Sequence, residues 1–252
     1  MKDIIQALSL SKKIILKDKV CLLLCLSPVV IGLILYYFVG QWFYGPVLSW
    51  GNELVARFIS KDALNIVIYY IFFGLISVFL FVLIGYTFNL VVSILASPFN
   101  DFLSGRVEKI LLGEKPQTLQ EGLMKSLRNF LVILREEIKK IIVISLIALI
   151  AVVLGFFPIL APVSFFLSAV CLSIQFLDYT WCRREMSFRS CFRDLKKFLF
   201  SYSFAGVLFS FIMMVPILSL FCISYAVVFY TIIWLLKYEK ERISVNALEV
   251  LK

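Results

Sequence analysis

Histidine is absent from the 252-residue sequence, and the six cysteines form no C-x-x-C pair. The commonest metal ligand and the usual general base are therefore missing. The cysteines lie mostly in apolar segments, so we expect them to be reduced and to form no disulfide framework. The chain also lacks a nucleophile motif, a Gly-rich phosphate loop and a nucleic-acid-binding module. We predict a protein that is not an enzyme, holds no metal or cofactor, and binds no nucleic acid.

Apolar residues are abundant instead. They make up 62% of the chain, and the mean hydropathy is +0.99, whereas a soluble domain is about 45–50% apolar. The 25 Lys and Arg residues outnumber the 16 Asp and Glu residues, which gives a net charge of +9. In a membrane protein such an excess reports cytoplasmic loops and anionic lipid headgroups. We predict an all-α integral membrane protein with a single membrane domain over residues 1–252.

The first half of the chain contains two candidate membrane crossings. Residues 1–19 have the pattern of a basic amphipathic helix that can lie in the membrane interface, without the cleavage site of a removable signal peptide. Transmembrane helices are predicted over residues 20–43 and 66–97, joined by a loop over 45–65. The second helix holds 32 uncharged residues, more than the hydrocarbon thickness requires, so it must tilt, kink or project beyond the bilayer.

Residues 98–140 follow as polar, basic, amphipathic helices. A proline restricts the residue before it, so the pair Ser97-Pro98 predicts the end or a kink of the preceding helix. Asn100 or Asp101 can then cap a new helix, and Gly113 is expected to close that helix as its C-cap.

Two apolar helical hairpins are predicted over residues 141–177 and 198–236. The arms of the first, over 141–154 and 163–177, fall short of the roughly 20 residues that span a bilayer, so we expect partial insertion. The arms of the second are longer, and both full and partial insertion remain open. A basic connection over 178–197 separates the hairpins, and a polar tail over 237–252 ends the chain.

The distribution of cations predicts the topology. The N-terminal segment carries 5 Lys or Arg residues, the segment before the first hairpin 8, the connection between the hairpins 6 and the tail 4, whereas the 45–65 loop carries 2. By the positive-inside rule, both termini and both long basic segments lie in the cytoplasm.

Three groups of residues resemble the signatures of one known family. The first is A-S-P-F-N-D over residues 96–101, followed by Glu108, and the second is I-Q-F-L-D-Y over residues 174–179. The third group consists of Pro216, Ala226, Val227, Thr231 and Trp234. In this order they resemble the CysZ-type sulfate permeases, which belong to the same family as the etoposide-induced membrane proteins. The likeness covers about residues 85–236.

The resemblance implies a multi-pass protein of the bacterial inner membrane. Its expected function is a passage for sulfate or a related small oxyanion that supplies sulfate for cysteine biosynthesis. One chain has too few full crossings to enclose a pore, so we expect a homo-oligomer in contact with membrane lipid.

An anion requires positive field and hydrogen-bond donors. Lys17 and Lys19 resemble the basic pair that precedes the first crossing of the permeases, and Arg106 and Glu108 can form part of an ion-pair network at a pore entrance. These four residues are our candidates for anion binding or a pore entrance. The alternative role of each is surface charge beside anionic lipid. The residues of the structural motif are Pro98, Phe99, Asn100, Asp101, Asp178 and Pro216.

The chain departs from the family at the first hairpin tip. Many permeases have a P-G-x-G turn there, whereas this chain has F-F-P-I-L over residues 156–160, which offers an anion fewer backbone N–H groups. The alternative function is therefore a membrane-shaping or scaffold protein, which binds anionic lipid and partner proteins without transporting a solute. Cations that converge on one cavity would favour transport, and cations spread along an interfacial plane would favour the scaffold.

Overall fold

The computed structural model describes residues 2–35, 37–38, 74, 91–115, 118, 120, 124, 142, 145–184, 186–213 and 216–243. The chain divides into two compact units: unit 1 comprises Met1–Pro28 and Ala96–Lys252, and unit 2 comprises Val29–Leu95. Regular secondary structure in the described residues is helical, with no strand, which confirms the all-α prediction. Among these residues, two helices are long and apolar enough to cross a membrane, or up to four if each bent pair is one span.

In unit 2 the described residues 29–35, 37–38, 74 and 91–95 are helical. The predicted loop over 45–65 and most of the predicted crossing over 66–97 lie outside the described residues. The same is true of most of the segment between residues 116 and 144 and of the tail after residue 243. The single-domain organisation therefore stays a prediction.

The chain begins with α1, Lys2–Lys17, where amphipathic residues were expected over 1–19. The apolar face of α1 is buried and its lysines at 12 and 13 are exposed, which is the arrangement that the sequence pattern favours. Asp18 then caps α2, Lys19–Cys25, by accepting hydrogen bonds from the backbone N–H groups of Val20 and Cys21. Lys2–Lys17 and Lys19–Leu35 meet at a bend of 105°.

The predicted helix end at Ser97-Pro98 is wrong, whereas a kink there stays a prediction. Residues 96–112 are helical without interruption, so Asn100 and Asp101 lie inside this helix and do not cap a new one. Proline removes one N–H from the helix ladder and crowds the carbonyl group four residues earlier, and apolar helices tolerate this where neighbouring helices satisfy the freed backbone groups. Here Asn100 is fully buried and its Oδ1 accepts a hydrogen bond from Ser224 Oγ at 2.8 Å.

The predicted C-cap at Gly113 is confirmed. Its φ of 72° lies in the left-handed region that favours glycine. The backbone N–H of Glu114 reaches back to the carbonyl of Lys109 at 2.9 Å, a bond that closes the last turn of the helix.

The first hairpin has a longer second arm than the sequence indicated. Its described part runs from Ser145–Gly155 through the short 3-10 helix η1, Pro158–Leu160, into α7, Ala161–Arg183. The stretch Pro158–Arg183 holds 26 residues and is long enough to span a membrane. The arm continues beyond residue 177 because Tyr179, Thr180 and Trp181 are buried. The first six residues of the predicted basic connection are therefore helical.

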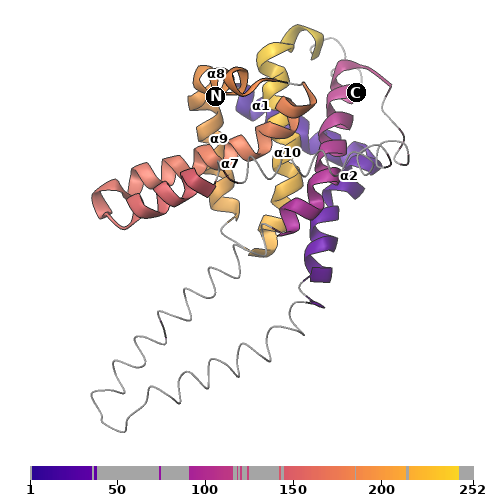
Figure 1. Ribbon diagram of the computed structural model, residues 1–252. Helices are drawn as coiled ribbons and strands as arrows, with labels where there is room; N and C mark the ends of the chain where they lie inside the picture. The colour runs from indigo at the N-terminus through magenta and orange to yellow at the C-terminus, as the bar shows by residue number, and fades with distance from the viewer. Residues whose placement is uncertain are drawn as a thin grey trace, which may run out of the picture. The chain divides into compact units, whose positions relative to one another are not determined.

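The second hairpin follows α8, Phe188–Lys197, and consists of α9, Leu199–Met213, and α10, Pro216–Tyr238 (Figure 1). Almost every side chain of α10 from residue 226 to residue 236 is buried, which makes this helix the centre of unit 1. α7 and α9 pack closely, and both contact α10. Ser173 Oγ lies where the three helices meet, 2.7 Å from the carbonyl oxygen of Tyr202 and 2.8 Å from Tyr230 Oη.

Gly206 on α9 allows this close packing, because a Cβ there would overlap the backbone of Ala169 on α7. We expect Gly206→Ala to push the two helices apart and to lower the free energy of unfolding by about 1–3 kcal/mol. Gly74→Ala is the matched control, since a Cβ at Gly74 would meet nothing within 4 Å. Thermal unfolding in detergent micelles measures both variants, and equal stability of the two would contradict this account of the helix contact.

Candidate functional site

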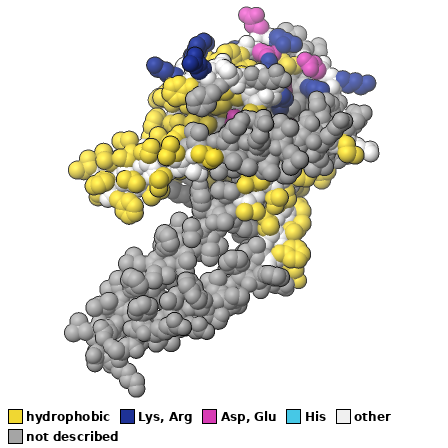
Figure 2. All heavy atoms as spheres, in the orientation of Figure 1, with side chains coloured by type: hydrophobic (Ala, Val, Ile, Leu, Met, Phe, Trp, Pro, Cys, Tyr) yellow, Lys and Arg dark blue, Asp and Glu magenta, His cyan; other side chains and the backbone are white. Residues whose placement is uncertain are grey.

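The described charged side chains of unit 1 lie mainly toward one end in the view of Figure 2. Most of the described side chains away from that end are hydrophobic. The exposed apolar side chains include Phe156 and Ile159 at the tip of the first hairpin, which are 81% and 91% exposed. An apolar surface with charges confined to one end suits a protein embedded in lipid with that end in water.

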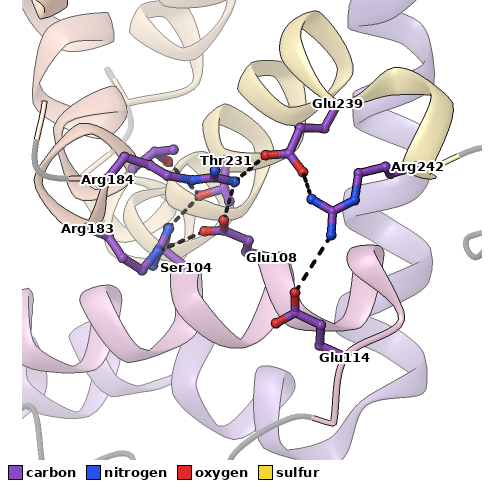
Figure 3. Close-up of polar contacts among 9 residues, drawn as sticks. Ser104, Glu108, Glu114, Arg183, Arg184, Thr231, Glu239 and Arg242 are labelled. Carbon is purple, nitrogen blue, oxygen red and sulfur yellow. Dashed lines mark hydrogen bonds and ion pairs between the residues drawn. The ribbon is translucent and has the colours of Figure 1, made fainter.

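Glu108 is the centre of one ion-pair network, which we call the Glu108 cluster: Glu108, Glu114, Arg183, Arg184, Glu239 and Arg242 (Figure 3). Arg183 Nε donates to Glu108 Oε2 at 2.8 Å, and Arg184 Nη2 donates to Glu108 Oε1. Arg184 Nη2 also donates to Glu239 Oε1 at 2.6 Å. The cluster therefore joins the ends of three helical segments: residues 96–112, α7 and α10.

The polar contacts of the Glu108 cluster extend toward exposed charged side chains on one side and toward buried hydroxyl groups on the other. On the outer side, Arg242 Nη1 donates to Glu239 Oε2 at 2.9 Å, and its Nη2 lies 4.0 Å from Glu114 Oε1. On the inner side, Arg183 Nη2 donates to Ser104 Oγ at 2.7 Å, and Ser104 Oγ lies 2.6 Å from Thr231 Oγ1. A line of polar contacts thus leads from exposed charge to buried hydroxyl groups.

Arg184 shows how the network compensates burial. Desolvation alone would lower the pKa of its guanidinium, but the carboxylates of Glu108 and Glu239 outweigh this effect and raise the pKa above its ordinary value. The guanidinium also lies over the ring of Trp234, with its Cζ 4.9 Å from the ring centroid. Three arginines face three glutamates in the Glu108 cluster, so its charges balance.

A second group of charges lies at the bend between α1 and α2, and we call it the bend group: Lys17, Asp18, Lys19 and Arg106. Arg106 Nε donates to Asp18 Oδ2 at 2.8 Å, which places the guanidinium beside the residue between the two lysines. Lys17 and Lys19 are exposed. Three cations stand against one carboxylate in the bend group, so these four residues carry net positive charge, in contrast to the Glu108 cluster.

The structure divides the four predicted site residues between the two groups. Arg106 pairs with Asp18, which lies between Lys17 and Lys19 in the sequence, whereas Glu108 pairs with the arginines at the end of α7. Sequence reasoning missed Asp18, although a lone acid between two lysines before an apolar run is the signal of a helix N-cap. It also missed Arg184 and Glu239, because their partners are far away in the sequence. Arg184 pairs with Glu108, 76 residues before it, and Glu239 pairs with Arg184, 55 residues before it.

The predicted motif residues lie in or beside helices and are buried or half-buried where the structure describes their side chains. Pro98 is buried, Phe99 is half-buried, and the carbonyl oxygen of Asp101 accepts a hydrogen bond from Arg183 Nη1 at 3.3 Å. Asp178 is half-buried on α7 and lies 3.7 Å from Cys182 Sγ. Pro216 begins α10, a position where the missing N–H costs the helix nothing.

A third group of charges joins the first helix, α1, to the end of α10. Lys237 Nζ on α10 lies 2.6 Å from Asp3 Oδ2 on α1, and Lys240 Nζ lies 3.7 Å from Asp3 Oδ1. The hydrogen bond from Lys237 lowers the pKa of the Asp3 carboxyl, and the charges of Lys237 and Lys240 add to this effect against the opposing effect of burial.

Within the described part of the chain, no three His, Cys, Asp or Glu residues are grouped to hold a metal ion.

Comparison with known proteins identifies related sequences. The model of a family described as sulfate transporter CysZ/etoposide-induced protein 2.4 matches residues 7–224. A protein from Salmonella paratyphi A named sulfate transporter CysZ is 28% identical over 213 residues, which cover 82% of each chain. A protein of the same name from Vibrio cholerae serotype O1 is 28% identical over 177 residues, covering 68% of this chain and 70% of its own.

The Glu108 cluster yields a prediction for stability. Glu108→Gln leaves two partly buried guanidinium groups without their shared carboxylate, so we expect the free energy of unfolding to fall by about 2–3 kcal/mol. Glu114→Gln is the matched control: Glu114 is 52% exposed and 4.0 Å from its partner, and its loss should cost less than about 0.5 kcal/mol. Denaturation in detergent measures both, and similar losses would show that Glu108 has no special structural role.

The pair of Asp3 and Lys237 predicts a pH dependence. Because the pKa of Asp3 is lowered in the folded protein, its stabilising contribution is complete above the ordinary value of 3.8 and is lost as the pH falls below it. We expect Asp3→Asn to lower the free energy of unfolding by about 0.5–1 kcal/mol at pH 7. The difference from the unsubstituted protein should shrink below pH 3.8, and a difference that stays constant across this range would refute the assignment.

Proposed function

We propose that this chain, which belongs to the sulfate transporter CysZ/etoposide-induced protein 2.4 family, provides a membrane passage for sulfate or a related small oxyanion. The observation that carries the proposal is the match to this family over residues 7–224, together with relatives named sulfate transporter that align over 82% of the chain. We further propose that the protein lies in the bacterial inner membrane with both termini in the cytoplasm and supplies sulfate for cysteine biosynthesis.

The bend group is the part of the described structure that best suits an incoming anion. Its cations are Lys17, Lys19 and Arg106, and Asp18 is its only acid. Asp18 already accepts hydrogen bonds from the first backbone N–H groups of α2 and from Arg106. These N–H groups are therefore not offered to an anion, and the positive field at the bend comes from the lysine and arginine side chains. Ammonium and guanidinium groups are the side-chain donors that bind oxyanions.

The Glu108 cluster has a supporting role in this proposal. Its balanced charges give it little attraction for an anion, and its contacts hold residues 96–112 against α7 and α10. Arg106 and Glu108 lie on the same helix, so the cluster fixes the position of Arg106 beside the bend. We propose that several chains assemble around the passage, because the described part of one chain supplies two helices that could span a membrane, or up to four if each bent pair is one span.

Flux of labelled sulfate into liposomes that contain the purified protein tests the passage. Chloride and phosphate are the competitors, and empty vesicles are the blank. Sulfate entry that depends on the protein supports the proposal. The absence of flux for every anion, in protein shown to be folded and oligomeric, would reject it and favour the alternative of a membrane-shaping or scaffold protein.

Within this assay, the bend group predicts a difference between two lysine pairs. We expect Lys17→Gln with Lys19→Gln to lower sulfate flux roughly fivefold, because the local positive field at the bend weakens. Lys12→Gln with Lys13→Gln removes the same charge from exposed positions of α1 and should leave the flux within about twofold.

Arg106 has its own pair of variants in the same assay. Arg106→Gln should lower the flux, and Arg106→Lys should retain part of it because the charge remains. If flux is unchanged in the Lys17/Lys19 pair and in Arg106→Gln, the bend group has no part in the passage, whatever carries the sulfate.

A further inference from the structure

The helix α8 presents one continuous exposed face that is basic. At 100° per residue its exposed residues fall on a single arc of the helix, and its buried residues fall on the opposite arc. The exposed residues are Arg189, Phe192, Arg193, Lys196 and Lys197. The acid of this helix, Asp194, is 3% exposed, so the exposed face carries four cations and no carboxylate.

Buried hydrogen bonds hold α8 in this rotation. Asp194 Oδ2 accepts from Trp181 Nε1 of α7 at 2.7 Å, and Asp194 Oδ1 accepts from Tyr238 Oη of α10 at 2.7 Å. Tyr202 Oη of α9 lies 3.4 Å from both carboxylate oxygens. Leu195, beside Asp194, is 7% exposed. A buried carboxylate with donors from three helices fixes which side of α8 faces outward.

The direction of α8 also matters. It meets the apolar helix α9 at an angle of 83°. If α9 enters the bilayer near the normal, α8 must lie along the membrane surface. Exposed apolar side chains accompany the cations at this corner: Phe192 is 62% exposed, and Phe200, in the first turn of α9, is 80% exposed. Aromatic side chains beside lysines and arginines are typical of the boundary between headgroups and hydrocarbon.

We propose that the exposed face of α8 is a docking surface for anionic phospholipid headgroups. The charge of the face is complementary to phosphate, and the perpendicular arrangement places several cations at one depth, where each can reach a headgroup. The inference does not rest on the proposed passage for sulfate, because a surface helix can bind lipid whether or not an anion crosses. A basic face along the membrane is also the feature expected of the alternative, a scaffold that binds anionic lipid.

Native mass spectrometry of the full-length protein, titrated in detergent with phosphatidylglycerol or phosphatidylcholine, tests the proposal. We expect phosphatidylglycerol to bind at least tenfold more tightly than phosphatidylcholine. The variant R189Q/R193Q/K196Q should lose most of this preference. The control K12Q/K13Q/K115Q removes the same charge from exposed lysines outside α8 and should retain the preference within about twofold. Thermal unfolding checks that both variants fold.

A second measurement reports on α8 itself. Hydrogen exchange of residues 188–198 in nanodiscs should be slower with phosphatidylglycerol than with phosphatidylcholine, and R189Q/R193Q/K196Q should abolish this difference. Equal loss of lipid preference in the two variants would mean that total charge matters and α8 does not. An unchanged preference in R189Q/R193Q/K196Q would show that α8 does not carry the lipid preference and would overturn the proposal. Neither readout involves sulfate flux, so the two proposals can fail separately.

Discussion

The sharing of one carboxylate between two arginines organises the charged end of unit 1. Glu108 accepts from Arg183 and Arg184, which are neighbours in the sequence but point to it from the last turn of α7 and the residue after it. Arg184 then reaches Glu239 just beyond α10. Without this carboxylate, the partly buried guanidinium group of Arg183 would lose its 2.8 Å ion pair, and that of Arg184 would keep its ion pair with Glu239. Glu108 therefore joins the helix over residues 96–112 to the end of α7, and Arg184 extends the network to the residue after α10.

The same constraint operates deeper in the unit, where hydroxyl groups take the place of charges. Ser104 pairs with Thr231, Ser224 pairs with Asn100, and Ser173 lies between α7, α9 and α10. Lipid offers polar groups no partner, so each of these side chains needs another inside the protein. Polar contacts thus specify which helices meet, while the abundant apolar surface is equally suited to lipid and to packing.

Charge balance separates structure from the two proposed functions. The Glu108 cluster matches three arginines with three glutamates, which suits a role in holding helices together. The bend group holds three cations and one acid, and the exposed face of α8 holds four cations; these are the two places for which we propose anion binding. In the bend group, Arg106 pairs with Asp18, which Lys17 and Lys19 flank in the sequence. α8 spreads its cations along a surface, as a membrane interface requires.

The sequence by itself determined the all-α membrane class, the apolar hairpins, the C-cap at Gly113 and the family, because composition, periodicity and glycine placement are local properties. It also placed Lys17, Lys19 and Arg106 among the functional candidates. Only the tertiary structure decided that Pro98 lies inside a continuous helix, that α7 extends to Arg183, and that Glu108 pairs with Arg183 and Arg184. These outcomes depend on contacts between residues far apart in the chain, such as Asn100 with Ser224. The sequence pattern shows that a proline disfavours a helix and that burying a charge is unfavourable. Only the tertiary structure shows whether neighbouring side chains compensate these effects.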